Sequence, residues 1–512
     1  MRVAQGTLRQ SSVSIPAPIG GWNARDSMAD MAPTDAVTMI NWFPGTTEVI
    51  LREGYVEWST GLIDQVQTLM SYAGAGAVQL FGVAGGNIYD CTNFGPVGAA
   101  SVSGLTNSKL QYQNVSTSGG DFMLCVNGDD KLQGYDGTSW WVDGDGSHDI
   151  TGVDTTTINN ITLFKNRIWM VQENSLSVWY LGTLSIAGAA TEFPLQGVAQ
   201  LGGYVVAAAT WTIDAGYGVD DNLAFITSRG EIIVYKGTDP TSSTTWALIG
   251  VWRLGAPVGQ RCLLKYQGDL LIISQDGVMP LSGALQSSRV NPRVALTDKI
   301  QSAVSNSIDV YGDNFGWQLL FFPKKNMLFL NVPINEDGEQ EQYVMNTITR
   351  NWCQFQGWSA NCWELFEDDA FFGGDGIVGR TFYAESDNGN NIQANVLQAF
   401  NYFGKPGRQK HFTLARPILR TSGNPQLSYN VNVDFNLERS TYPLSFSPTP
   451  DAIWDVSLWD SGLWGGDLSV QKNWVGVNKV GYCASTQLQL AAKDIQVRWV
   501  STDLVFEMGS VL

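Results

Sequence analysis

Histidine is scarce in this chain: only His148 and His411 occur among 512 residues. This scarcity excludes most zinc sites and most histidine-based catalytic triads, because histidine is the commonest metal ligand and general base. The cysteines show no CxxC pair and no regular spacing, which predicts reduced, mostly buried thiols; they stand at 91, 125, 262, 353, 362 and 483. No P-loop, GxSxG or HExxH motif occurs either, so we do not expect an enzyme.

Long apolar runs are also missing. The longest run, residues 204–209, is far shorter than the roughly 20 residues that a membrane-spanning helix needs. At the N-terminus, Arg2 and Arg9 are not followed by the apolar stretch of a signal peptide. We therefore expect no membrane-spanning segment and a protein made inside the cell.

Charge is low, and positive charge is the rarer sign. Charged residues make up 15% of the chain, and 30 Lys and Arg stand against 48 Asp and Glu, which gives a formal net charge of −18. A protein that grips DNA needs a basic surface, because contacts with phosphates supply most of the affinity. This composition excludes a typical nucleic-acid reader, although an acidic chain can still lie beside DNA that it repels.

Glycine and aromatic residues, in contrast, are plentiful. The chain has 55 Gly, 22 Phe, 17 Tyr and 19 Trp, and 44% of its residues are hydrophobic. This composition predicts many short strands joined by tight turns. The length suits one large β-domain and a second, smaller one.

A repeated pattern begins at about residue 62: a polar turn, a short apolar segment with an aromatic residue, and another turn. Gly86-Asn87-Ile88-Tyr89 and Glu231-Ile232-Ile233-Val234-Tyr235 are clear copies. One residue from each copy serves as an anchor, at 89, 135, 180, 235, 281, 344 and 383. The intervals are 46, 45, 55, 46, 63 and 39 residues, close to the roughly 40–50 residues of kelch and WD40 blades.

The segments before and after each copy supply the other strands that a propeller blade needs. Most copies follow another strand-like run, at 78–83, 122–126, 168–171, 223–227 and 270–274. Several precede a tryptophan suited to an outer strand, namely Trp140, Trp246 and Trp352. We therefore expect an all-β fold built on a six-bladed β-propeller, with seven blades as the alternative.

Four regions are expected along the chain. Residues 1–20, rich in Gln, Ser and Pro, form an N-terminal arm without a packed core. Residues 21–61 form a docking or closure segment with a short helix at 34–40 and a strand at 48–58. Residues 62–407 form the propeller, with a helical insertion near 294–310, and residues 408–512 form a C-terminal β-sandwich-like domain of alternating strands.

One acidic loop has the spacing of a calcium site. Asp143, Asp145, Ser147 and Asp149 place oxygen side chains at alternate positions, and Asp154 falls at loop position twelve, as in an EF-hand. Position six is His148 where glycine is usual, and no flanking helices are evident, so an acidic turn is the alternative. These five oxygen-bearing residues are the candidate metal site, and no other cofactor is expected.

Two further features carry both a structural and a functional interpretation. Acidic residues cluster at Glu336/Asp337, Glu339/Glu341 and Glu367/Asp368/Asp369. Solvated turns explain these clusters, and a glycosidase pair is the alternative. Tryptophan recurs every five residues at Trp454, Trp459 and Trp464. Such residues are typical of a β-core or a subunit interface, and a sugar-stacking platform is the alternative.

Several motifs resemble those of a known family. Asn41-Trp42-Phe43-Pro44, followed by Leu51-Arg52-Glu53-Gly54-Tyr55, is similar to the N-terminal region of tail nozzle proteins from short-tailed bacteriophages. In that family an N-x-x-P-like element precedes an R-x-G turn that leads into a propeller. The stretches 230–240, 250–261, 268–270 and 277–282 look like recurrent segments of phage and prophage proteins. The resemblance covers residues 20–285 in the main.

The resemblance implies a structural virion protein without catalytic residues. It implies a homohexameric ring of propellers at the end of the tail, below the head–tail adaptor on the portal side, assembled in the host cytoplasm. Such nozzles retain packaged DNA, let it pass through the lumen on infection without sequence-specific binding, and have fibres or spikes attached nearby. Two alternatives remain: a glycan-binding or depolymerising virion propeller, and a kelch-like scaffold for protein interactions.

Overall fold

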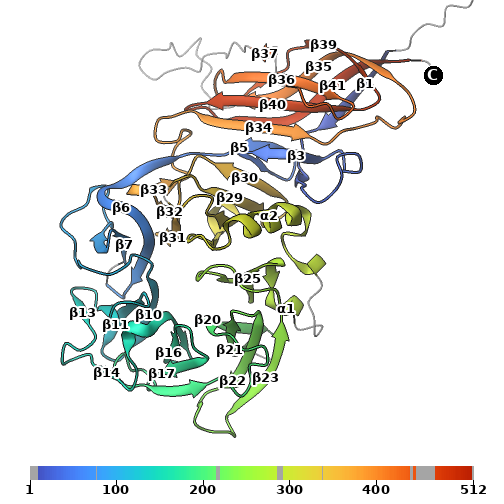
Figure 1. Cartoon of the computed structure of the whole chain (residues 1–512). Helices are drawn as coiled ribbons and strands as arrows, with labels where there is room; N and C mark the ends of the chain where they lie inside the picture. Colours follow the sequence, from blue (N-terminus) through green and yellow to red (C-terminus); the bar gives the residue numbers. More distant parts are fainter. Residues whose placement is uncertain are drawn as a thin grey trace, which may run out of the picture. The chain divides into compact units, whose positions relative to one another are not determined.

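The computed structural model describes residues 10–76, 78–214, 219–284, 292–336, 338–438, 442–444 and 468–509 (Figure 1). Contacts divide the chain into two compact units. Unit 1 consists of Met1–Val56, Tyr343–Gly357 and Thr381–Leu512, and unit 2 consists of Glu57–Gln342 and Trp358–Arg380. Each unit is therefore assembled from segments that are far apart in the sequence.

Unit 2 is a β-propeller, in which small antiparallel sheets follow one another around a ring (Figure 1). The first sheets contain β7 (Val78–Ala84) and β8 (Asn87–Asp90); β10 (Gln111–Thr117), β11 (Gly120–Val126), β12 (Gln133–Tyr135) and β13 (Trp140–Val142); and β15 (Ile158–Phe164), β16 (Arg167–Gln172), β17 (Ser177–Tyr180) and β19 (Thr191–Pro194). The later sheets contain β20 (Val205–Asp214), β21 (Val219–Thr227), β22 (Glu231–Gly237) and β23 (Trp246–Arg253); β24 (Leu263–Tyr266), β25 (Asp269–Ser274) and β26 (Gly277–Pro280); β27 (Gln318–Phe322) and β28 (Met327–Val332); and β31 (Cys362–Phe366), β32 (Asp369–Gly373) and β33 (Asp375–Thr381). Strand β29 (Glu341–Asn346) begins in unit 2, and its residues from Tyr343 on belong to unit 1.

The ring is closed by one long strand, β6 (Tyr55–Ala73), which belongs to two neighbouring pairings. Its later part pairs with β7 in antiparallel register from Val66 to Ala73, and the strand also pairs with β33. Two residues with positive φ, Gly61 at 84° and Asp64 at 74°, lie just before the β7 pairing begins. The last blade is thus completed by a strand from the start of the chain.

Seven blades are present among the described residues, one more than the six that we preferred from the sequence. The first strand of each sheet contacts the first strand of the next, in the series β10, β15, β20, β24, β27 and β31. Inner strands of propeller blades meet in this way around a central axis. Seven is the alternative that the seven sequence anchors allowed, and the last sheet is completed by β6, which lies about 300 residues before β33.

Aromatic side chains pack neighbouring blades together. Trp169 of β16 stacks on Trp246 of β23 at 5.5 Å between ring centroids, and Trp246 stacks on Tyr235 at 5.6 Å. Phe193 and Phe225 join the same buried cluster. This packing explains why tryptophan recurs on the outer strands of the repeat.

Unit 1 contains two sheets of the sandwich type. One sheet joins β1 (Gln10–Pro16), β4 (Trp42–Pro44), β5 (Val49–Leu51), β35 (Lys410–Thr421), β38 (Ser469–Gln471), β39 (Val475–Gly481) and β41 (Val497–Met508). The other includes β2 (Gly21–Trp22), β3 (Asp35–Ile40), β30 (Trp352–Gln356), β34 (Ile392–Gln398), β36 (Gln426–Val433), β37 (Tyr442–Leu444) and β40 (Ala484–Ala492). Buried and partly buried residues alternate along β35, β40 and β41, as expected for sheets with one face in a core.

Two predictions for the N-terminal region are wrong. The helix expected at 34–40 is the strand β3, because Val37, Thr38 and Ile40 are β-branched and β34 supplies a pairing partner. Residues 10–16 of the expected arm form β1, which pairs with β41 along its whole length. A polar segment can still form a strand, because the pairing uses backbone hydrogen bonds. The Gln-, Ser- and Pro-rich composition of residues 1–20 therefore did not reveal β1.

The domain limits also differ from those expected. Residues 381–407 group with unit 1, whereas the propeller was expected to continue to residue 407. Strand β34 explains the difference, since it pairs with β3 and β40 of unit 1.

The structure confirms two further expectations, a helix in the insertion and buried, free cysteines. A helix, α2 (Gln301–Tyr311), lies in the predicted insertion, preceded by a 3-10 turn at Asp298–Ile300. All six cysteines are free and buried. In the part of the chain that the structure describes, no helix has the length and apolar character to cross a membrane.

Candidate functional site

The loop predicted to bind calcium lies after β13 in unit 2. Asp143 is buried, and its carboxylate accepts hydrogen bonds from the backbone N–H of Ile150 at 2.8 Å and from the hydroxyl of Thr155 at 2.6 Å. Asp154 caps the short 3-10 helix that follows by accepting from the N–H and the hydroxyl of Thr156. Both carboxylates therefore accept hydrogen bonds from donors of the loop itself.

The middle of this loop is organised in the same way. Asp145 accepts from the backbone N–H groups of Ser147 at 2.6 Å and His148 at 2.8 Å, and it contacts Nδ1 of His148 at 3.0 Å. The His148 side chain and these N–H groups lower the pKa of Asp145 to about 2. Asp149 accepts from the N–H of Gly146 at 2.9 Å. Among the described residues no three metal-ligating side chains come together, and calcium at this loop stays a prediction.

The acidic clusters support the fold where the structure describes them. Glu336 accepts from the N–H of Phe315 at 2.5 Å, and Asp369 forms ion pairs with Lys324 and Arg380. Residues that lie outside the described part of the chain are Asp337, Trp454, Trp459 and Trp464.

A central cavity of about 310 Å³ lies where the inner strands of the propeller meet. Every blade contributes lining residues, among them Leu69, Tyr112, Asn160, Ala208, Leu264, Leu319 and Glu364. Polar side chains join adjacent inner strands around it. Asn160 accepts from the N–H of Ala208 at 3.1 Å, and Gln318 exchanges two hydrogen bonds with the backbone of Trp363 at 2.8 and 3.0 Å. The cavity therefore lies at the centre of the ring of blades.

Four ionisable side chains line this cavity: Arg261, Lys265, Glu364 and Tyr112. Arg261 donates to the backbone carbonyl of Gln67 at 3.1 Å and to the hydroxyl of Thr68 at 2.6 Å. Glu364 is hydrogen-bonded to Tyr112. Burial raises the pKa of Glu364 to about 7, although the Tyr112 hydrogen bond and the charge of Arg261 oppose the shift. The cavity therefore holds a carboxyl group that titrates near neutral pH.

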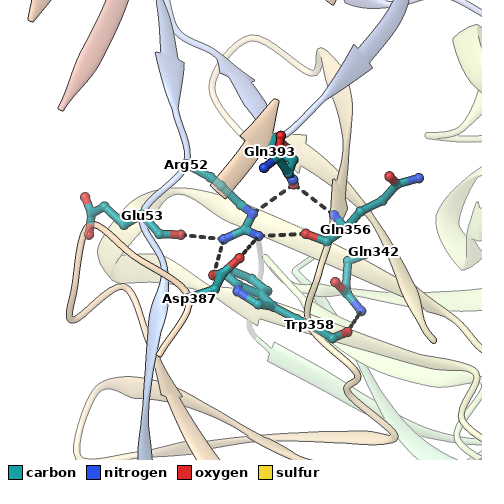
Figure 2. A network of polar contacts seen from close by, with 8 residues as sticks. Arg52, Glu53, Gln342, Gln356, Trp358, Asp387 and Gln393 are labelled. Carbon is teal, nitrogen blue, oxygen red and sulfur yellow. Dashed lines mark hydrogen bonds and ion pairs between the residues drawn. The ribbon is translucent and has the colours of Figure 1, made fainter. Parts of the chain in front are cut away.

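In unit 1, Arg52 is the centre of a buried polar network (Figure 2). Its two terminal nitrogens donate to the two carboxylate oxygens of Asp387 at 2.7 and 2.6 Å, which is the bidentate geometry of strong ion pairs. Its Nε donates to Oδ1 of Asn41 at 2.8 Å, and the guanidinium also donates to the backbone carbonyls of Glu53 at 3.1 Å and Gln356 at 2.6 Å. The buried charge is therefore compensated on several sides.

This network joins the N-x-x-P element and the R-x-G turn of the N-terminal region. Asn41 comes from the N-x-x-P element and Arg52 from the R-x-G turn. Asn41 has φ of 59°, a left-handed conformation that asparagine tolerates well. At Gly54 a Cβ atom would lie 1.9 Å from the carbonyl oxygen of Ser386, so only glycine fits. Hydrogen bonding at Asn41 and Arg52, and the lack of space for a side chain at Gly54, therefore explain why these residue types occur in the motif.

A groove of about 730 Å³ lies beside this network, within unit 1. Its lining consists of Ile40, Gln356, Gln393, Ala394, Asn395, Asn424, Pro425, Gln426, Leu427, Ser428, Gln489, Leu490 and Ala491. None of these residues is ionisable, and six carry side-chain amides. Sequence reasoning missed the groove because its amides come from four separate segments and show no spacing signal.

No family model matches the chain, and no curated protein matches it. Among solved structures, BBS1N in complex with ARL6DN has 8% identity and a TM-score of 0.38, with 64% of this chain and 97% of that chain covered. YCF48 bound to D1 peptide has 13% identity and a TM-score of 0.31, with 53% and 91% covered.

Raptor of Chaetomium thermophilum has 11% identity and a TM-score of 0.37, covering 68% of this chain and 29% of the Raptor chain. This chain therefore spans less than a third of Raptor. Such low similarity carries no functional argument. The strand topology itself defines the class of protein: an all-β propeller with an additional β-sandwich-like unit.

Proposed function

We propose that this chain is the tail nozzle subunit of a short-tailed bacteriophage, a structural virion protein that retains packaged DNA and serves as its ejection conduit. The observation that carries the proposal is the buried network in which Asn41 and Arg52 meet, because these residues belong to the motif that resembles the nozzle family. If the members of a family fold this part of the chain in the same way, the residues of their shared motif are expected to contact one another.

The proposed assembly is a homohexameric ring below the head–tail adaptor on the portal side, with fibres or spikes attached nearby. Six chains of net charge −18 would carry a formal charge of −108. Duplex DNA carries one phosphate charge per roughly 1.7 Å, so an acidic lumen would repel it on close approach. Salt confines that repulsion to roughly 8 Å, which suits a conduit that DNA passes without binding.

Immunogold electron microscopy of intact virions tests this proposal. Virions of the phage that encodes the chain are labelled with a gold-conjugated antibody against it. Gold confined to the distal tail, with six-fold end views, is the expected result. Gold on peripheral fibres would favour the glycan-binding alternative, and no label on intact or opened particles would overturn a virion role.

A further inference from the structure

The groove of unit 1 has a floor made of two parallel rows of side chains. In one row Ile40 lies opposite Asn395, Asn395 opposite Gln489, and Gln489 opposite Ser428. Residues directly opposite one another share a face of the sheet, so these four side chains point to the same side. The row runs across β3, β34, β40 and β36.

The second row lies two residues further along the strands. Gln393 is opposite Ala491, and Ala491 is opposite Gln426. The rows are therefore about 6.7 Å apart along the strands, and neighbours within a row are about 4.8 Å apart. This lattice offers amide groups in two dimensions on a rigid sheet.

Several of these amides have no partner within the described chain. The side chains of Gln393, Gln426 and Gln489 make no hydrogen bond to another described residue, whereas Asn395 accepts from Gln487 at 3.1 Å. Each amide provides one acceptor oxygen and two N–H donors. The groove therefore presents unused donors and acceptors together.

The buried Arg52 network, drawn in Figure 2, includes two residues that line the groove, Gln356 and Gln393. Asn41 donates to the backbone carbonyl of Gln393 at 2.7 Å and accepts from the N–H of Gln356 at 2.8 Å. Arg52 donates to the carbonyl of Gln356 at 2.6 Å. The backbones of these two groove residues are thus held in place, which fixes where their side chains start.

We propose that this groove binds a neutral, hydroxyl-rich oligosaccharide. A charged ligand would find no opposite charge in the lining, and an apolar ligand would leave the amides unsatisfied, at about 1–3 kcal/mol for each group. A hydroxyl group both donates and accepts, so it matches an amide lattice. The volume lies within the roughly 300–1,000 Å³ of small-molecule sites.

An extended peptide fits less well. Peptide strands usually bind by adding to the edge of a sheet, where free backbone groups are available. The groove lies on a sheet face, and the backbone groups of β34 and β40 are used in pairing with each other. The lining has no aromatic ring for stacking, so we expect weak binding, with Kd about 1 mM. The proposal does not depend on the nozzle assignment.

Saturation-transfer difference NMR on the full chain tests the proposal. The probes are maltohexaose, cellohexaose, dextran hexamer and the N-acetylglucosamine hexamer, with a galacturonic acid hexamer as the charged probe and a mixed decapeptide library as the peptide probe. We expect saturation transfer to at least one neutral oligosaccharide and none to the acidic one. No transfer to any neutral probe at about 10 mM would overturn the proposal, as would selective binding of the peptides.

Two variants locate the site. The double variant Gln393→Met/Gln489→Met removes two amides with little change in volume, and Gln275→Met, at an exposed turn of the propeller, is the matched control. We expect the double variant to weaken binding at least tenfold at an unchanged melting temperature, and the control to bind like the wild type. Equal binding by both variants would place the sugar elsewhere and overturn the assignment of this groove.

Discussion

At the scale of single residues, Arg52 illustrates how a charge becomes tolerable inside a protein. Its side chain is fully buried, and an unpaired ion there would cost several kcal/mol. The bidentate contact with Asp387 and the donation to Asn41 replace the lost water. The motif indicated from sequence that Arg52 matters, but its carboxylate partner lies 335 residues away and no sequence signal joins them.

We predict that Arg52→Met destabilises unit 1 by about 3–5 kcal/mol, because Asp387 is left with an uncompensated charge. Urea unfolding followed by circular dichroism measures the change. The matched control is Arg416→Met, which breaks the partly exposed ion pair with Asp503 and should cost less than about 1 kcal/mol. If both variants lost the same free energy of unfolding, the buried ion pair would contribute no more to stability than the partly exposed one.

A second residue-scale prediction concerns Glu364 in the propeller cavity. Its pKa is raised to about 7 in the folded protein by burial, whereas it is about 4.5 in the unfolded chain. Between these values the unfolded state loses its proton first, so the stability of the propeller should fall as pH rises from about 4.5 to 7 and then level off.

The variant Glu364→Gln should remove this dependence, since glutamine cannot ionise and still accepts a hydrogen bond from Tyr112. We expect it to be more stable than the wild type at pH 8, by on the order of 1–2 kcal/mol because Glu364 is partly exposed and solvent screens part of the effect, and no more stable at pH 4.5. Thermal unfolding across this pH range measures the difference. Glu173→Gln, at an exposed turn, is the control, and a gain of the same size there would refute the assignment to Glu364.

At the scale of elements, the sequence located the strands better than the connections between them. The aromatic anchors at 89, 135, 180, 235 and 344 lie in the third strand of successive blades, and those at 281 and 383 follow such a strand within two residues. The runs at 78–83, 122–126, 168–171, 223–227 and 270–274 lie in the second strands. Sequence patterns located these strands because the alternation of apolar and polar residues that marks a strand is visible within a few residues. The pairings of β6 with β33 and of β1 with β41 join distant parts of the chain, so no local pattern predicts them.

The positive φ of Gly61, within β6, leads to a prediction about closure of the propeller ring. Gly61 has φ of 84°, and a Cβ atom there would meet nothing within 4 Å, so a substitution adds backbone strain without a clash. Gly61→Val should destabilise the propeller by about 1–2 kcal/mol and increase hydrogen exchange in β33 and β6, because a β-branched residue avoids this conformation. Gly61→Asn is the control, since asparagine tolerates positive φ. If hydrogen exchange in β33 and β6 were the same in the two variants, the positive φ at residue 61 would not be needed for ring closure.

At the scale of the whole molecule, composition excludes more than it identifies. The charge of −18 argues against a typical DNA reader, and the scarcity of histidine argues against most zinc sites and most histidine-based catalytic triads. The groove and the titrating cavity could not be foreseen, because both are made by the convergence of strands from distant parts of the chain.

The net charge makes a direct prediction about DNA. A 60-base-pair duplex should not bind the full chain at about 10 μM protein in a gel-shift experiment, even at about 20 mM salt, where attraction to a basic surface would be strongest. A basic DNA-binding protein of similar size serves as the positive control. A shifted band that disappears at high salt would reveal a basic surface and contradict a repelling conduit.

The segmented make-up of unit 1 has a consequence for biosynthesis. A ribosome delivers β1 first, yet the strand that pairs with it, β41, begins only at Val497. At roughly 5–20 residues per second, β1 waits on the order of half a minute or more for its partner. During that time the nascent chain carries an unpaired strand, a site where growing polypeptides stick to one another. Ribosome stalling or premature termination before codon 497 should therefore yield insoluble product rather than a smaller folded protein.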